Sequence, residues 1–214
     1  PFRFTLICKS TNPAKYKIKN LGMVNFTIDI KYTDVKKELR LYAAAICGGM
    51  NQGVDLLNCY TKGGKININV KCNDAYKPTG PYGLFPDDTP YVYIYAGGLC
   101  SDGGGAFFSD SKTRKPLEFV HIEKCFNDSD ISVDTQNCIG IIYGAGIIAS
   151  MGETHIHECY NSGNITLPLR LDDMLGGNMA TYAAGISACA YIRELPGIYH
   201  WGTEATSFIQ NCYN

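Results

Sequence analysis

IHECY (residues 156–160) is one copy of a phrase that occurs five times along the chain. The other copies are LLNCY (56–60), IEKCF (122–126), IQNCY (209–213) and a divergent first copy, IKNLG (18–22), which ends in Leu-Gly. The shared pattern is apolar-x-polar-Cys-aromatic. Such self-similarity is typical of repeat architectures, in which no single repeat can bury its apolar face and neighbouring repeats form a common core.

A second phrase follows each of the first four copies after a few residues. In it β-branched or aliphatic residues alternate with polar ones, as expected for strands with one buried face. The apolar positions are Ile28 and Ile30, then Ile66, Ile68 and Val70, then Ile131 and Val133, then Ile165, Leu167 and Leu169. Between the two phrases, Gly63 and Gly163 are expected at corners, where a positive φ suits glycine.

A third phrase consists of one tyrosine, three small residues and an aliphatic residue. Its small residues, such as Ala96, Gly97 and Gly98, are expected to allow close approach of backbones. The four copies are YAAAI (42–46), YAGGL (95–99), YGAGI (143–147) and YAAGI (182–186).

The spacing between equivalent cysteines is irregular, at 66, 34 and 53 residues. Variable inserts between short strand-like phrases favour a coil whose corners carry loops. We therefore predict an all-β fold, a right-handed parallel β-helix with three short strands per coil and about four to five coils. The predicted units are 18–55, 56–121, 122–155, 156–208 and the start of another at 209–214, and residues 1–17 form an N-terminal cap or a preceding strand.

Stacked coils place equivalent residues on top of one another. The files Ile18/Leu56/Ile122/Ile156/Ile209 and Leu21/Cys59/Cys125/Cys159/Cys212 should therefore point inward. Most of the ten cysteines are expected to be buried thiols, because parallel side chains in register give poor disulfide torsions. The alternative is a disulfide between non-equivalent cysteines such as Cys72 or Cys138.

The A-G-G-[IL] and [IL]-x-N-C-Y-N-x-G-x-I patterns resemble the GLUG-type repeats of large bacterial surface and adhesin-like proteins, which also occur in the non-catalytic part of IgA-specific peptidases. The best-matching stretches are Tyr95–Leu99 and Ile156–Ile165. The resemblance implies a β-solenoid on a secreted or cell-surface bacterial protein, with a role in adhesion or display. It transfers no catalytic residue.

Composition limits the partners. A net charge of −1 gives no electrostatic reason to expect nucleic acid, and no apolar run is long enough for a membrane-spanning helix. Because the chain begins at Pro1 without a leader and ends just after a fifth phrase has begun, we expect it to be part of a longer polypeptide. A host or microbial glycan or protein is the expected partner.

Three long inserts are the expected place of function, because loops carry binding residues on rigid scaffolds. They are 71–90, 101–116 and 190–207, and the third contains the candidate ligand-binding residues Tyr199, His200 and Trp201. Exposed aromatic side chains can stack on sugars or bind a protein partner. Alternatively, the aromatic residues of the inserts pack over the coil as a flap.

No catalytic residue, metal site or cofactor is predicted. His155 and His157 share one face of a strand near Glu153 and Glu158, but a third metal ligand is not evident, and solvent-facing histidines are the simpler interpretation. Asp87-Asp88 and Asp172-Asp173 leave a polysaccharide lyase or glycosidase open as an alternative, because sequence cannot place them in one groove. A phage tail-spike fragment is the third possibility. The favoured hypothesis is a non-catalytic stalk or adhesive segment.

Overall fold

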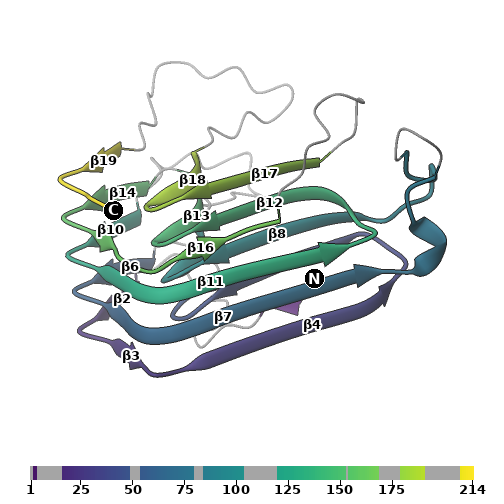
Figure 1. Cartoon of the computed structure of the whole chain (residues 1–214). Coiled ribbons are helices and arrows are strands. Elements are labelled where there is room, and N and C mark those ends of the chain that lie inside the picture. Colours follow the sequence, from purple (N-terminus) through teal and green to yellow (C-terminus); the bar gives the residue numbers. More distant parts are fainter. Residues whose placement is uncertain are drawn as a thin grey trace, which may run out of the picture.

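The chain passes through the same four parallel sheets once per repeat unit. In the computed structural model it is all-β and moves from sheet B to C, A and D before starting again (Figure 1). A single turn of 3-10 helix, η1 (Asp74–Tyr76), lies between sheets C and A. The structure describes residues 2–3, 16–48, 54–79, 84–103, 120–152, 154–168, 179–190 and 208–214.

The four sheets have the following strands. Sheet B contains β2 (Tyr16–Lys19), β6 (Val54–Leu57), β10 (Val120–Glu123), β14 (Thr154–His157) and β19 (Phe208–Gln210). Sheet C contains β3 (Gly22–Val24), β4 (Thr27–Val35), β7 (Tyr60–Cys72), β11 (Phe126–Gln136), β15 (Tyr160–Asn161) and β16 (Ile165–Thr166). Sheet A contains β1 (Phe2–Arg3), β5 (Leu39–Ala44), β8 (Tyr91–Gly97), β12 (Ile139–Ala145) and β17 (Met179–Ala184). Sheet D contains β9 (Cys100–Gly103), β13 (Ile148–Met151) and β18 (Ser187–Ala190).

The predicted isoleucine file is confirmed. In sheet B, Leu56 pairs with both Ile18 and Ile122, and Ile156 pairs with both Ile122 and Ile209. The three middle members are fully buried, whereas Ile209, on the last strand, is 46% exposed. Each unit therefore completes the core of its neighbours, and the last one leaves apolar surface open.

The cysteine file is also inside. Cys59, Cys125 and Cys159 are buried just after the sheet B strands, and the Cys59 N–H points at the Cys125 sulfur at 3.3 Å. The pKa of Cys125 is raised to about 12. The side-chain hydrogen bond with Cys159 is the largest cause, and burial is the next cause that raises it. As predicted for most of the cysteines, no disulfide joins any of the nine that the structure describes, and the sulfurs of Cys72 and Cys138 contact each other at 2.8 Å. Cys8 lies outside the described residues.

A buried polar file runs beside the cysteines. The Asn127 amide accepts from the Thr61 hydroxyl and donates to Ser129 O at 3.0 Å and to Asn161 Oδ1 at 2.7 Å. Asn161 in turn donates to Asn214 Oδ1 at 2.7 Å. Because each amide is satisfied by the unit above or below, these groups can be buried without a large penalty.

The turn between sheets B and C depends on one left-handed residue per unit. The residue before the cysteine position has φ between 51° and 57° in all five units, whichever side chain it carries. Asparagine adopts this conformation readily, and the three asparagines fit that preference. The five residues are Asn20, Asn58, Lys124, Glu158 and Asn211.

Three details of the predicted coil are wrong. The second, third and fourth units have strands in four sheets rather than three. The short sheet D strands were not predicted because β9 and β13 are buried throughout and so show no alternation. The sheet C strands are also long, with 13 residues in β7 and 11 in β11. Gly63 has the expected positive φ, at a bulge in β7, but Gly163 does not. Its Cβ would instead lie 2.1 Å from Ser129 O, so a close backbone approach requires this glycine.

Candidate binding surface

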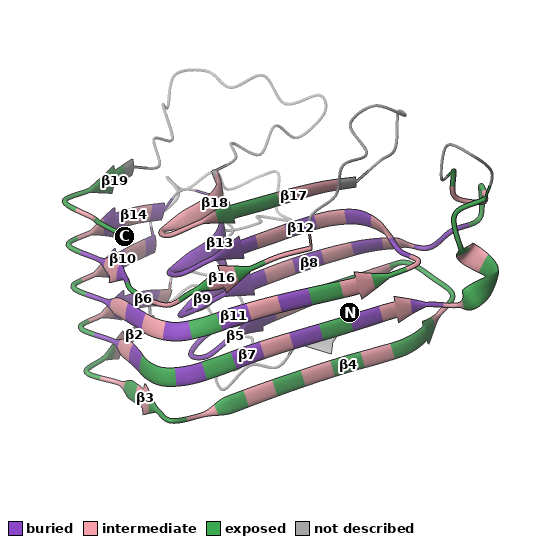
Figure 2. Cartoon of the chain, viewed as in Figure 1, coloured by how far each residue is buried: buried purple, intermediate pink, exposed green. Residues whose placement is uncertain are grey.

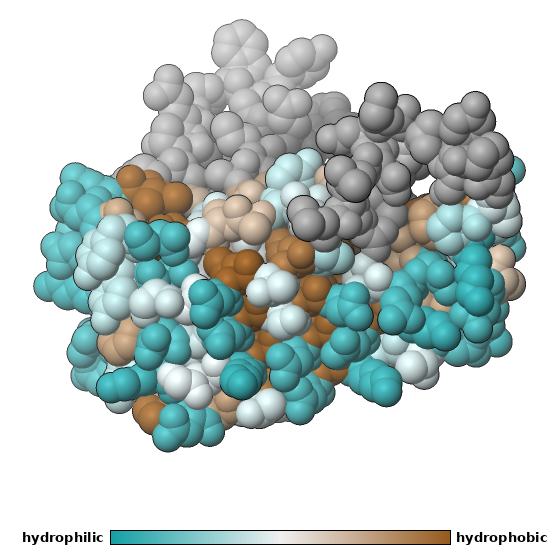
Figure 3. All heavy atoms as spheres, in the orientation of Figure 1, coloured by the Kyte–Doolittle hydropathy of each residue, from teal (hydrophilic) through white to brown (hydrophobic). Residues whose placement is uncertain are grey.

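Burial alternates along the strands of sheets A and C, so each sheet presents a file of side chains outward (Figure 2). On sheet C the outward file begins with the stacked rings of Tyr60, Phe126 and Tyr160. Beyond these rings the outward residues are mainly charged or polar, with Lys65 paired to Asp130. Hydrophilic side chains gather over the lower part of this face and at its ends (Figure 3). Apart from those rings, the outer face of sheet C is therefore an ordinary solvated surface.

The outer face of sheet A differs because it carries a file of tyrosines. Tyr42, Tyr95, Tyr143 and Tyr182 come from four successive units and are paired in register. Their ring centroids are 4.8, 5.2 and 5.1 Å apart, with interplanar angles of 3°, 24° and 13°. The first three side chains are half-buried and Tyr182 is 46% exposed. We call these four residues the tyrosine ladder.

A second outward file lies beside the tyrosine ladder. The Arg40 guanidinium sits 4.9 Å from the centre of the Tyr93 ring and is held by Glu38 at 2.7 Å. Tyr93 also contacts Tyr91, with ring centroids 4.8 Å apart. Burial raises the pKa of Tyr91, and it raises that of Tyr143 to about 12, so these phenols are neutral hydrogen-bonding groups at physiological pH.

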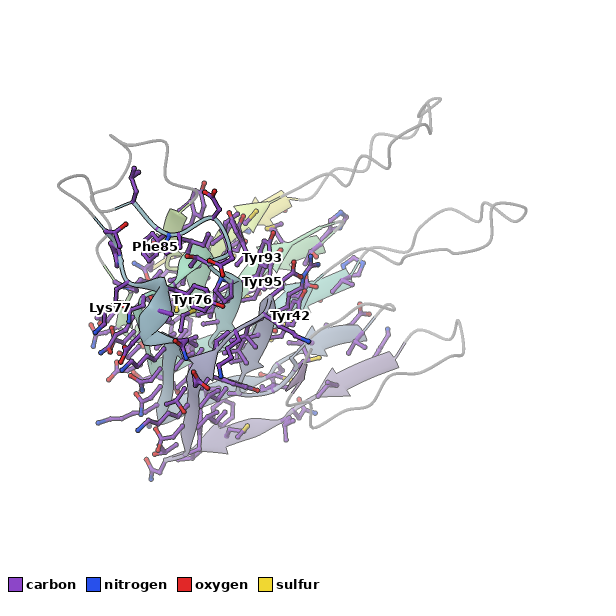
Figure 4. The ribbon with its side chains drawn as sticks, turned by 90° about the vertical axis from the view of Figure 1, so that its right-hand side faces the viewer. Tyr42, Tyr76, Lys77, Phe85, Tyr93 and Tyr95 are labelled. Carbon is purple, nitrogen blue, oxygen red and sulfur yellow. The ribbon has the colours of Figure 1, made fainter. Side chains whose placement is uncertain are left out.

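The first insert adds aromatic groups at the corner between sheets C and A. Asn73 caps η1 by accepting from the Ala75 N–H at 2.9 Å, and Tyr76 packs against the core. Figure 4 shows Tyr76, Lys77 and Phe85 of this insert together with Tyr42, Tyr93 and Tyr95 of sheet A. For Tyr76, the predicted packing over the coil is confirmed.

The predicted ligand-binding residues Tyr199, His200 and Trp201 lie outside the described residues. So do Glu153, Asp172 and Asp173, while Asp87 and Asp88 are exposed in the first insert. The sequence did not single out the tyrosine ladder as a site. In the sequence, the ladder corresponds to the tyrosine that begins each copy of the third phrase. That phrase was interpreted only through its small residues.

The group around His155 and His157 gains neighbours from other strands that the sequence spacing did not indicate. His155 pairs with His121, 34 residues earlier, and their rings meet edge to face at 5.1 Å. The buried Asp55 carboxylate accepts from the His121 backbone N–H at 3.0 Å, and His157 Nδ1 is 3.6 Å from Glu158 Oε1. Within the ranges that the structure describes, no three His, Cys, Asp or Glu side chains are arranged to hold a metal ion.

No protein-family model matches the chain, and neither the curated proteins nor the solved structures contain a significant match. Among the described residues there is no helix of the length and apolarity needed to span a membrane.

Proposed function

We propose that the chain is a segment of right-handed parallel β-helix from a bacterial cell-surface protein. It serves as a rigid stalk or binds a host or microbial glycan or protein, without catalysis. The chain is one part of a longer polypeptide that is secreted or displayed at the cell surface.

In-register stacking carries the proposal. Five units repeat the same apolar position in sheet B, which is fully buried in the three middle units, and the pairing is parallel from β2 through β19. A structure in which each unit contacts only its neighbours extends along one axis and resists bending through its hydrogen-bonded sheets. These properties suit a spacer that holds a binding surface away from an attachment point.

The distribution of outward side chains supports binding over catalysis. A polysaccharide enzyme on this scaffold would need convergent carboxylates at a defined separation. On sheet C, the carboxylates of Asp128 and Asp130 accept hydrogen bonds from Ser162 and Asn164, at 3.1 and 3.0 Å. Aromatic rings, by contrast, form outward ladders on both sheet A and sheet C, and such rings suit a recognition surface.

The test is binding of the purified chain to an array of immobilised glycans and extracellular proteins, with Trp201→Ala beside the wild type. Saturable binding to one class of glycan or protein supports adhesion. Turnover of any arrayed polysaccharide would overturn the non-catalytic assignment. Sedimentation analysis distinguishes the tail-spike alternative, because a stable trimer is expected for a tail spike and a monomer for a stalk segment.

A further inference from the structure

We propose that Cys72 and Cys138 are a site of covalent modification, at which oxidation forms a disulfide bond between the second and third repeat units. The two residues lie at the corner between sheets C and A, where β7 and β11 end (Figure 1). The inference rests on the proposed secreted or cell-surface location, because disulfides form and persist in oxidising compartments outside the cytoplasm.

The first argument is the contact between the sulfurs. Cys72 and Cys138 are 66 positions apart in the sequence, yet their sulfurs lie 2.8 Å apart. A disulfide bond is about 2.0 Å long, so the sulfurs need to approach by less than about 1 Å to form it. The two residues are 0% and 1% exposed, so a bond between them is shielded from reductants.

The second argument is the orientation of the two cysteines. Stacked residues with the same backbone conformation have parallel side chains, which suit a disulfide poorly. Cys72 ends the extended strand β7, whereas Cys138 follows Asn137, whose φ is 54°. The last paired residues of β7 and β11 are Lys71 and Gln136, so Asn137 is an extra residue before the second cysteine. The two side chains therefore start from different local backbones.

The cysteine file has the opposite arrangement. Each of its cysteines follows a left-handed residue, so all of them share one backbone conformation. Cys125 also has two sulfur neighbours, because its side chain hydrogen-bonds with both Cys159 and Cys59. We therefore expect this file to remain reduced when the corner pair is oxidised.

The corner pair has no such competition below it. In the first unit, the residue in register with Cys72 is Val35, so Cys138 is its sulfur neighbour. Cys47 and Cys100 also meet across two units, but they pair directly as a parallel bridge. Their orientations match, and they should stay reduced like the cysteine file.

The reaction is an exchange with the disulfide of an oxidant, such as glutathione disulfide or a disulfide-bonded oxidoreductase. The thiolate of one cysteine attacks the oxidant, which forms a mixed disulfide and releases one thiol. The thiolate of the other cysteine then attacks the sulfur of the first, and the second oxidant thiol leaves. Cys72 and Cys138 together lose two protons and two electrons, which the oxidant gains. Because both sulfurs are buried in the folded chain, exchange takes place while the corner is open during folding.

The experiment is refolding of the whole chain from urea, with and without a mixture of oxidised and reduced glutathione. Remaining thiols are blocked with iodoacetamide in urea, and the unreduced digest is mapped by mass spectrometry. We expect one cross-link, between Cys72 and Cys138, with Cys59 and Cys125 alkylated. Alkylated Cys72 and Cys138 after oxidative refolding would overturn the proposal, as would a cross-link between Cys59 and Cys125 in their place.

Thermal unfolding tests whether the bond fits the native fold. A disulfide across 66 positions constrains the unfolded chain and should raise the midpoint by about 10 °C relative to the reduced protein. Cys72→Ala should show no difference between the two conditions. Cys125→Ala is the matched control, because Cys125 is also buried in a stack of cysteines, and it should keep the full difference. If Cys72→Ala does not fold, the peptide map of the wild type still decides. A lower midpoint for the oxidised wild type would mean that the bond distorts the corner, and would refute the proposal.

Separate outcomes distinguish this site from the proposed function. Binding of the chain to an arrayed glycan or protein, without any cross-link between Cys72 and Cys138 after oxidative refolding, would refute the disulfide and leave the adhesive function standing. A cross-link that forms with glutathione, but is absent from the protein isolated from the cells that make it, would support the site and contradict the secreted or cell-surface location.

Discussion

Replacing Asn127 by alanine should cost far more stability than any other change in the asparagine file. The side chain is fully buried and connects three units, with Thr61 below and Asn161 above. The substitution leaves the Thr61 hydroxyl, the Asn161 amide oxygen and Ser129 O without this partner. A buried polar group left unsatisfied costs about 1–3 kcal/mol, so the three groups together should cost about 3–9 kcal/mol.

The same file supplies graded controls. Asn161→Ala should cost less than Asn127→Ala, because its partner Asn214 is exposed and can turn to water. Asn214→Ala, at the end of the file, should cost less than about 1 kcal/mol, as is usual for exposed positions. Thus the order of destabilisation should follow the position in the stack.

Urea unfolding followed by circular dichroism measures these differences, with Ser132→Ala on the outer face of sheet C as the neutral reference. A cost of about 3–9 kcal/mol is a large part of the roughly 5–15 kcal/mol that stabilises a typical domain, so the shift in the urea midpoint should be obvious. If Asn127→Ala and Asn214→Ala unfold at the same urea concentration, the file is not a continuous buried ladder and the stacking of units is refuted.

Three further predictions concern the core. Gly146→Ala should destabilise by about 2–3 kcal/mol in urea unfolding, because the new Cβ would lie 2.2 Å from the Asn161 side chain. Ile122→Ala should cost about 2–5 kcal/mol and Ile209→Ala less than about 1 kcal/mol, since the first is fully buried and the second half-exposed. The raised pKa of Cys125 favours its neutral form in the folded state, so its contribution is complete below pH 9 and is lost as pH approaches about 12. A pH series of thermal unfolding should therefore show a smaller alkaline loss for Cys125→Ala than for the wild type.

The sequence predicted the interior better than the outside. The isoleucine and cysteine files could be found because each unit must repeat an apolar residue at the same buried place, and this repetition survives inserts of any length. The asparagine file was readable by the same logic, since Thr61, Asn127, Asn161 and Asn214 each follow the aromatic residue of the first phrase. It was missed because polar residues were assigned to the outside.

Other features had no local signal. The left-handed turn residue is Asn, Lys or Glu in different units, so no residue type marks it. Sheet D is buried on both faces, and its strands therefore lack the alternation by which a strand is recognised. His121 lies 34 residues before His155, and Asp55 lies 66 residues before His121. Only strand register brings these residues together, and no spacing rule predicts it when inserts vary in length.

The two aromatic ladders separate the need for a ring from the need for a hydroxyl. Stacking contributes about 0.5–1.5 kcal/mol per ring pair, so both ladders have a sufficient reason to repeat an aromatic ring. At other outward positions the residues change from unit to unit, as in Lys65 and Asp130, because the core does not constrain them. The need for a ring explains an aromatic residue in every unit, but it does not explain why all four sheet A positions are tyrosine when Phe126 serves equally well in the other ladder. At Tyr143 the hydroxyl has a role within the fold, because its side chain hydrogen-bonds with Cys189 of sheet D. Tyr143→Phe should therefore lower the midpoint of urea unfolding, and an unchanged midpoint would contradict this role.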